Sequence, residues 1–317
     1  MRIAIISDVH GNYPALVSVV EDAVSNNADK FIFLGDYIFD LPFSNEIARF
    51  LMKLEDVYII KGNREGYLKG LANDNQDNWT SNQFGNAYQT FRELSPDVCN
   101  FLNNLEEERH IQLDSGISIY AVHFPKNIKP SPKLSAISGI GFHKRMLEKP
   151  FSHEQFLSEF NELINSDELK SQIEEIESDI IMFGHNHLQS YGYCGDKLII
   201  NPGSCGQPFD FNPAAAYSIL EITDNGFNVT EKRVEYDIES VINQAKKTIL
   251  YEKSRVWSEL VFRCLRTGRN YFDVFFEIAR QVAASENEQG ANFSNSTWDE
   301  AYEIFKERKI YENMQGK

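Results

Sequence analysis

The chain has 317 residues, a hydrophobic content of 42%, a charged content of 25% and a formal net charge of −16 at pH 7. This length is enough for a complete α/β core, and the acidic balance argues against a general binder of nucleic acid or of anionic membranes. It does not exclude a phosphate-bearing substrate, because a bound metal ion can reverse the local field. Every apolar run is shorter than the ~20 residues that span a bilayer.

The cysteines are spread along the chain without a Cys-x-x-Cys pair: Cys99, Cys194, Cys205 and Cys264. This spacing is typical of a reduced cytoplasmic protein and gives no sign of a thiol-based site. The opening MRIAIISDVHGN resembles a buried strand more than a signal peptide, since its apolar run is short and an acid follows at once. We therefore expect a cytoplasmic protein whose cysteines carry no chemistry.

The first two thirds of the chain alternate short apolar runs with amphipathic stretches, the pattern of an α/β domain. In chain order, buried strands are predicted at 3–7, 31–35, 57–62, 117–122 and 179–183. Helices are predicted between them at 45–54 and 80–105, and an earlier helix should place on one face Leu16, Val17, Val20, Ala23 and Val24. The three strand-like runs that follow have the spacing of a β-meander.

From residue 238 onward the apolar period becomes helical. One segment places its apolar residues on a single face: Trp257, Leu260, Val261, Cys264 and Leu265. We predict an α/β domain over 1–235 and a helical C-terminal extension over 236–317. The extension either packs on the core or forms the interface of a homodimer.

Five predicted strands run directly into polar side chains that can bind metal: Asp8, His10, Asp36, Asn63, His123, His185 and His187. The carboxyl ends of strands in α/β sheets line the crevice where ligands bind. Alternate residues of an extended segment project to the same side, so each of the two pairs separated by one residue should aim at one point. A lone histidine of this kind would be better explained as a buried polar group, but the whole set would not.

The set combines two carboxylates, one amide oxygen and four imidazoles without a thiolate. Such donors suit Mn, Fe, Zn, Co or Ni. Seven ligands exceed the needs of one tetrahedral ion, but they fit two ions that share a carboxylate. The sequence therefore predicts a centre of two divalent transition metals.

The motifs DVHGN, GDY, GNRE, VH after a strand, and GHNH followed by NPGS resemble those of the calcineurin-like metallophosphoesterases. The likeness is greatest to the small bacterial branch that opens with Asp-x-His-Gly-Asn, and it extends over residues 1–235. It implies a four-layer αββα sandwich of two mixed sheets flanked by helices, with the metals at strand ends. It also implies hydrolysis of a phosphate monoester or diester by a hydroxide that bridges two metals, manganese being the first expectation.

The resemblance also assigns the ligands. One metal would be held by Asp8, His10, Asp36 and His187. The second would share Asp36 and be completed by Asn63, His123 and His185. The NPGS turn would lie beside this centre.

The third motif departs from the family, because many relatives have histidine where this chain has Arg64. That histidine is taken as a proton donor, which arginine cannot be near neutral pH, although arginine can hold phosphate oxygens. We expect Asn63 and Arg64 to take part in catalysis; alternatively, Arg64 is a surface residue paired with a nearby acid. A second departure is Phe124, which adds bulk beside His123.

Substrate binding is expected of Arg64, Asn12 and His143. Asn12 can cap the helix that follows it, can lie near the phosphate, or can do both. His143 is an alternative acid and lies in a basic segment, 124–150, whose single acid is Glu148. This segment is either a lid that attracts anionic substrates or a solvated loop.

The competing hypothesis is a non-catalytic scaffold for protein binding, as in the retromer subunit that resembles this family. The complete set of ligand residues argues against that reading. The expected partner is a phosphate-ester substrate, with no general nucleic-acid binding and no membrane association.

Overall fold

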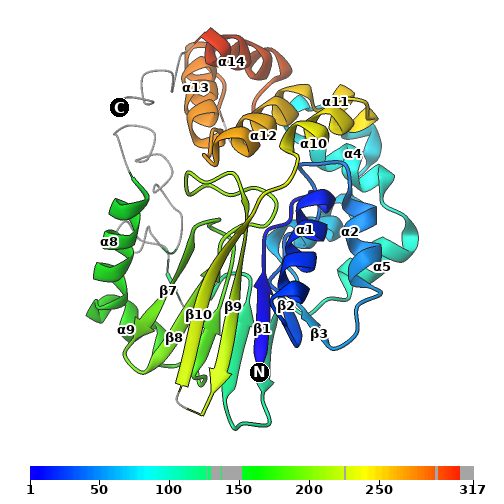
Figure 1. Ribbon diagram of the computed structural model, residues 1–317. Coiled ribbons are helices and arrows are strands. Elements are labelled where there is room, and N and C mark those ends of the chain that lie inside the picture. The colour runs from blue at the N-terminus through cyan, green and yellow to red at the C-terminus, as the bar shows by residue number, and fades with distance from the viewer. Residues whose placement is uncertain (127, 130–136, 138–151, 225, 290–291, 308–317) are drawn as a thin grey trace.

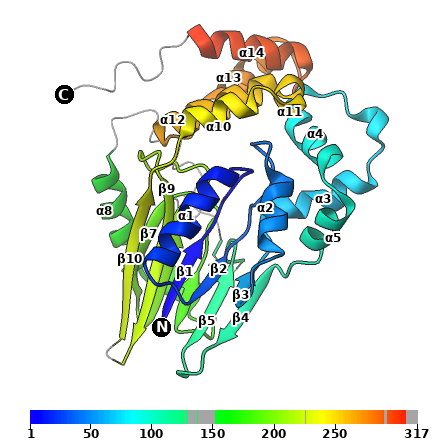
Figure 2. The same ribbon diagram turned by 45° about the vertical axis from the view of Figure 1, so that its right-hand side comes forward.

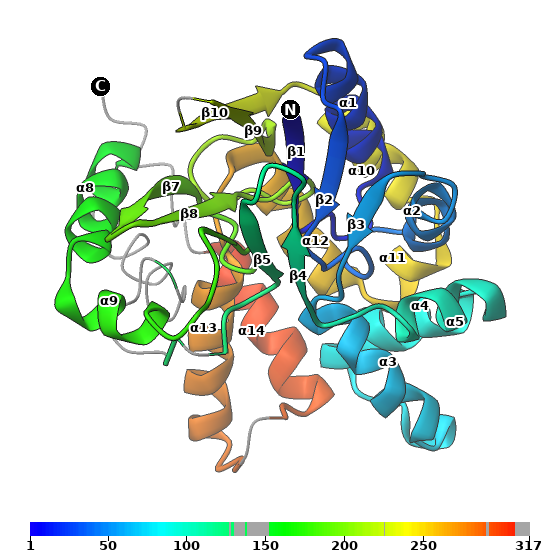
Figure 3. The same cartoon turned by 90° about the horizontal axis from the view of Figure 1, so that it is seen from below.

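The computed structural model of the protein describes residues 1–126, 128–129, 137, 152–224, 226–289 and 292–307. Within these ranges the strands form two five-stranded sheets that lie face to face (Figure 1). Helices cover the outer face of each sheet, as the view from below shows (Figure 3). The predicted four-layer αββα sandwich is therefore confirmed.

The first sheet has the order β10-β9-β1-β2-β3. Its three parallel strands are short and apolar: β1 (Arg2–Ile6), β2 (Lys30–Phe33) and β3 (Val57–Ile59). On the other side of β1, β9 (Ala215–Thr223) and β10 (Gly226–Val234) pair antiparallel as a hairpin. The sheet is thus mixed, and its parallel strands all end at the same edge.

The second sheet has the order β4-β5-β6-β8-β7. Its parallel centre consists of β5 (Ser118–Val122), β6 (Ile180–Met182) and β8 (Lys197–Pro202). The antiparallel edges are β4 (Glu108–Gln112) and β7 (Gln189–Cys194). Both edge strands were absent from the sequence prediction, because several of their side chains are exposed and no clean apolar run marks them.

Aliphatic side chains fill the space between the sheets, including Ile5, Ile32, Ala121, Met182 and Ile200. Five helices pack on the first sheet's side: α1 (Tyr13–Ser25), α2 (Ser44–Leu51), α3 (Asn63–Asn73), α4 (Gly85–Glu93) and α5 (Pro96–Asn103). Two helices pack on the second sheet: α8 (His153–Ile164) and α9 (Asp167–Ile173). One apolar layer thus lies between the sheets and one lies under the helices on each outer face. Together they fix the relative positions of the sheet edges.

Two expectations about the elements are wrong. The meander does not form, because β8 belongs to the second sheet while β9 and β10 form a hairpin in the first. The buried face of α1 is also different: Ala15, Leu16, Val19 and Ala23 are buried, whereas Val24 is 59% exposed. The helix packs on the first sheet through these four residues, so Val24 faces solvent.

The C-terminal extension consists of α10 (Ile238–Ala245), α11 (Ile249–Lys253), α12 (Arg255–Thr267), α13 (Phe272–Ser285) and α14 (Asn295–Glu307). It lies over one end of the sandwich (Figures 1 and 2). Its two apolar clusters incorporate Leu41 and Phe209 from loops of the α/β core. The predicted α12 face is buried at Leu260, Val261, Cys264 and Leu265.

Packing on the core, one of the two alternatives for these helices, is thus what the structure contains. A homodimer and an independent domain boundary at 235 stay predictions. Among the described helices, none is long and apolar enough to cross a membrane.

Candidate metal centre

The loops that follow the strands have an unusual backbone conformation. Asp8, His10, Asp36, His185 and His187 all have positive φ, between 48° and 72°. The expectation that extended segments aim alternate side chains at one point is therefore wrong, because these loops are not extended. Left-handed turns bring the side chains together instead. Such strain in non-glycine residues gathers at functional sites.

Three buried side chains form the first group of donors. His10 Nε2 lies 3.1 Å from His187 Nε2, and Asp8 Oδ1 lies 3.3 Å from His187 Nε2 and 3.7 Å from His10 Nε2. Phe209 stacks on the imidazole of His187 with 4.4 Å between ring centroids. The ring is thereby held in place from the side of the C-terminal helices.

Four side chains form the second group. Asn63 Oδ1 lies 3.0 Å from both His123 Nε2 and His185 Nδ1, and these two nitrogens are 3.3 Å apart. Asp36 Oδ2 lies 3.4 Å from His123 Nε2 and 3.8 Å from His10 Nε2 of the first group. Asp36 therefore stands between the groups, as a shared ligand must. His185 is exposed, so this side of the centre faces solvent.

The hydrogen bonds of the imidazoles favour positive charge beside Nε2 of His123, within the second group. His187 Nδ1 lies 2.6 Å from the carbonyl of Gln207, and His123 Nδ1 lies 2.7 Å from the carbonyl of Leu34. Each of these nitrogens must carry a hydrogen and donate it, so the neutral ring has a lone pair on Nε2. The lone pair of His123 then faces the acceptor oxygen of Asn63, a repulsive arrangement. A metal ion or an extra proton resolves it.

The charge of the centre follows the same logic. Burial lowers the pKa of His10 and His123, but the surrounding carboxylates outweigh it and raise these pKa values to about 9 and about 10. Burial raises the pKa of Asp8, yet the neighbouring histidines hold it well below its usual range. Asp8 Oδ1 is buried and accepts no hydrogen bond from the described residues. The donors therefore attract positive charge, and they fit metal ions.

Two clusters of candidate ligands satisfy the geometry for an ion, Asp8 with His10 and His187, and Asp8 with Asp36 and His123. Residues 1–189, more than half of the chain, match the family of the calcineurin-like phosphoesterases. The chain belongs to this family. Its members depend on metal ions, and this chain has candidate groups that could hold them.

Three individual proteins are similar to this chain. The uncharacterized protein MJ0912 of Methanocaldococcus jannaschii is 25% identical over 260 residues, which are 79% of this chain and 94% of the relative. A metallophosphoesterase from Sphaerobacter thermophilus has a TM-score of 0.57 at 22% identity and covers 84% of this chain and 99% of its own. Protein PH1004 from Pyrococcus horikoshii OT3 has a TM-score of 0.57 at 16% identity, with coverages of 81% and 97%. The last two show the fold.

Sequence reasoning about this phosphoesterase missed Glu65, the last residue of the GNRE motif. Its buried carboxylate accepts hydrogen bonds from the backbone N–H groups of Asp36, Tyr37 and Gly62, at 3.0, 2.8 and 2.8 Å. A Cβ at Gly62 would lie 2.2 Å from Asp36 Oδ1. The motif therefore shapes the loop that carries the shared ligand. The glutamate three residues after a helix-capping glycine was the available signal.

Asp40 was also missed. Its buried Oδ2 lies 2.8 Å from His10 Nδ1 and 3.5 Å from Arg64 Nη2, and its Oδ1 accepts a hydrogen bond of 2.7 Å from the indole of Trp257. Burial raises the pKa of Asp40, but Arg64 and His10 outweigh it and hold it at about 2. Asp40 thus fixes the orientation of a predicted ligand and connects it to α12. A carboxylate inside the apolar run IFDLPF was the available signal.

Two further predicted site residues, Arg64 and Asn12, make contacts of their own near the centre. Arg64 donates its backbone N–H to Asp36 Oδ1 at 2.8 Å, and its guanidinium lies beside the centre, paired with Asp36 and Asp40. The expected pairing with a nearby acid is therefore present, and its part in catalysis stays a prediction. Asn12 caps α1 by accepting a hydrogen bond from Ala15 N–H, and its amide donates to the Gly206 carbonyl and the Tyr236 hydroxyl. Its contact with phosphate stays a prediction.

Three further expectations can be placed in the structure. Ser204 of the NPGS turn donates to the Asp8 carbonyl at 2.6 Å, so this turn lies beside the centre as predicted. Phe124 packs 5.3 Å from the ring of His185. His143 and most of the basic segment lie outside the described residues. Within that segment Lys126 forms an exposed ion pair with Glu107.

Proposed function

We propose that this phosphoesterase hydrolyses a phosphate monoester or diester with the help of two divalent transition-metal ions, manganese first among them. The observation that carries the proposal is the convergence of seven donor side chains, in two groups that meet at Asp36. The role that we propose for each ligand rests on this geometry and on the family.

Asp8, His10 and His187 would hold one ion, and Asn63, His123 and His185 the other, with Asp36 shared. Bound ions of this kind supply Lewis acidity and lower the pKa of water so that it attacks phosphorus. The chain's own part is to keep the donors in position. Glu65 holds the loop of Asp36, and the carbonyls of Gln207 and Leu34 fix the orientation of two imidazoles.

Arg64 would bind the phosphoryl group. Its Nε and Nη2 form ion pairs with Asp36 Oδ2 at 3.9 Å and with Asp40 Oδ2 at 3.5 Å. Since no described residue accepts a hydrogen bond from this guanidinium, its donors are available to phosphoryl oxygens. Arginine stabilises the charge that develops there but does not protonate a leaving group.

The test is a screen of metal-reconstituted protein against p-nitrophenyl phosphate, bis(p-nitrophenyl) phosphate and simple alkyl esters. Turnover that depends on added Mn²⁺ and disappears in His187→Ala supports the proposal. Glu55→Gln, a change at an exposed residue outside the donor set, serves as a control. A folded protein that binds metal without turning over any ester would instead favour the non-catalytic scaffold.

A further inference from the structure

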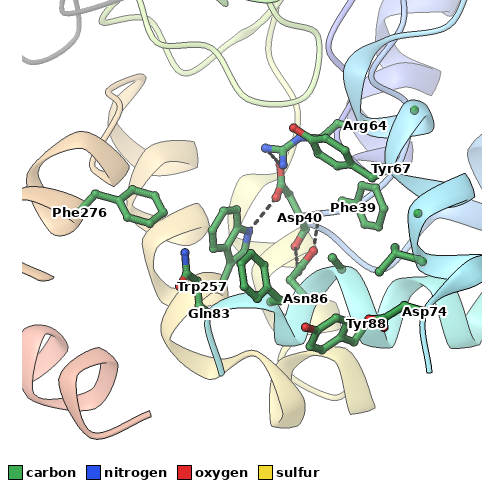
Figure 4. A pocket seen from close by; sticks show the side chains of 15 residues that line it. Phe39, Asp40, Arg64, Tyr67, Asp74, Gln83, Asn86, Tyr88, Trp257 and Phe276 are labelled. Atoms are coloured by element: carbon green, nitrogen blue, oxygen red, sulfur yellow. Dashed lines mark hydrogen bonds and ion pairs between the residues drawn. The ribbon is translucent and has the colours of Figure 1, made fainter. Parts of the chain in front are cut away.

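A pocket of about 570 Å³ opens directly beside the proposed metal centre. It shares Asp40 and Arg64 with the surroundings of the centre, and its other walls come from α3, α4 and the C-terminal helices α12 and α13 (Figure 4). Its volume falls within the roughly 300–1,000 Å³ of small-molecule sites. The C-terminal extension, which supplies none of the seven donors, therefore completes a cavity next to them.

The lining of this pocket is rich in aromatic rings: Phe39, Tyr67, Phe84, Tyr88, Trp257 and Phe276. Phe39 and Tyr67 lie on one side of Asp40, and Trp257 and Phe276 lie on the opposite side (Figure 4). The indole of Trp257 is fixed by its 2.7 Å hydrogen bond to Asp40. Rigid aromatic faces on two sides of a cavity favour a planar ring between them.

The charges of the lining argue against a second anionic group. Arg64 is its one cation, and Asp40 and Asp74 are acidic. Since Arg64 lies at the end nearest the metal centre, the deeper part has no positive charge to bind a polyphosphate chain. A neutral ring fits this lining, while the phosphorus stays beside Arg64.

Helix α3 contributes an independent observation. Gly66 and Gly70 are four residues apart in this helix, so they lie on one face, and both line the pocket. A Cβ at either position would meet nothing within 4 Å. No protein contact therefore requires glycine here, although glycine is unfavourable inside a helix. What the two glycines do provide is open space over the pocket wall.

The geometry points to an aromatic subsite: the pocket binds the organic group of an aryl or heteroaryl phosphate ester whose phosphorus lies at the metal centre. This inference rests on the proposed function, and it names the substrate class. Phe39, Tyr67, Trp257 and Phe276 contact the ring, and the absent side chains of Gly66 and Gly70 leave room for it.

The test is calorimetric binding of phenylphosphonate and methylphosphonate to the full-length chain in excess Mn²⁺, because neither ligand can be hydrolysed and each has one organic group. Wild type should bind phenylphosphonate at least tenfold more tightly. Gly70→Leu should remove most of that preference while the melting temperature stays at or above that of wild type. Lys69→Leu, which adds the same side chain one residue away and outside the lining, should leave it unchanged.

Tyr67→Ala gives a second variant, since this side chain is 49% exposed, and Tyr67→Phe, which loses only the hydroxyl 3.4 Å from Asn63 Nδ2, is its control. Tyr67→Ala should weaken phenylphosphonate severalfold and leave methylphosphonate nearly unaltered. Equal affinity of wild type for the two phosphonates, or no binding of either, would overturn the aromatic subsite. Preferential phenylphosphonate binding without ester turnover would keep the subsite and sink the proposed hydrolysis instead.

Discussion

Asp36 is the residue on which both halves of the proposed centre depend. Its carboxylate lies within 3.8 Å of nitrogens from each group, whereas Asn63 contacts only the second group. Asp36→Asn should therefore reduce the content of both metals and lower kcat/KM more than Asn63→Ala does. Elemental analysis and steady-state kinetics of the two variants check this. Equal and small losses would mean that another side chain is shared.

Arg64 lies where the family resemblance led us to expect a histidine, and this should appear in the choice of leaving group. Wild type should favour aryl over simple alkyl esters, because poor leaving groups need a proton that arginine cannot supply. Arg64→Ala should lower kcat/KM for aryl and alkyl esters alike. The loss should correspond to an increase of about 2–4 kcal/mol in activation free energy. Arg64→His should partly recover alkyl esters. If the wild-type rate is nearly independent of leaving-group pKa, Arg64 has a structural role only.

Glu65 should matter for stability as well as for the site. Its carboxylate accepts three backbone hydrogen bonds in the interior, and hydrogen bonds to charged groups each contribute about 1.5–3 kcal/mol. Glu65→Gln leaves buried N–H groups unpaired. The free energy of unfolding in urea should therefore fall by at least the contribution of one such bond, about 1.5–3 kcal/mol. The exposed Glu55→Gln should change it little. Comparable urea midpoints for the two variants would argue that the loop of Asp36 does not need this carboxylate.

The donors themselves could be predicted from the sequence, but the residues that hold the donors in position could not. Asp8 and His123, for example, are polar residues that directly follow apolar runs. Such positions predict a shared site because strand ends meet at one edge of a sheet. Glu65, Asp40 and Trp257 act through backbone groups or through another side chain. Such contacts join segments far apart in the chain, as between Trp257 and Asp40, and no local pattern reports them.

At the scale of elements, the strands end before the ligand residues, and left-handed loops position the ligand side chains. β1 ends at Ile6 and β2 at Phe33, so the ligands lie on loops beyond the ladders. Apolar runs predicted the central strands because these are buried on both faces. The edge strands β4 and β7 have too few buried side chains to form an apolar run. The place of β9 beside β1 depends on pairing between segments more than 200 residues apart, which periodicity does not encode.

Helix α12 connects the C-terminal extension to the core, and its packing can be tested. Phe262 is 1% exposed in a cluster with Leu41 and Val261. Phe262→Ala should lower the free energy of unfolding by about 3–5 kcal/mol. Ile249→Ala, at a residue 57% exposed, should stay within about 0.5 kcal/mol of wild type.

Because the helices share clusters with loops of the core, chemical unfolding of Phe262→Ala should remain one transition. A separate early transition for the helices would show that residues 236–317 form an independent domain.

At the scale of the molecule, the sandwich supplies the donors and the extension covers one side of them. Phe209 stacks on His187 and also belongs to the C-terminal apolar cluster, and Trp257 contacts Asp40. Family resemblance predicted the sandwich, but it could not predict that helices beyond residue 235 reach the centre. The extension therefore belongs to the site, whatever its role in association between chains.

The central claim, that these donors form a two-metal centre that hydrolyses phosphate esters, is tested most directly by counting metal. Protein reconstituted with Mn²⁺ and freed of excess should contain about two ions per chain by elemental analysis. A chelator should abolish turnover of bis(p-nitrophenyl) phosphate and p-nitrophenyl phosphate, and Mn²⁺ should restore it. Traces of metal at most, with no activity gained on adding Mn²⁺, would contradict the account.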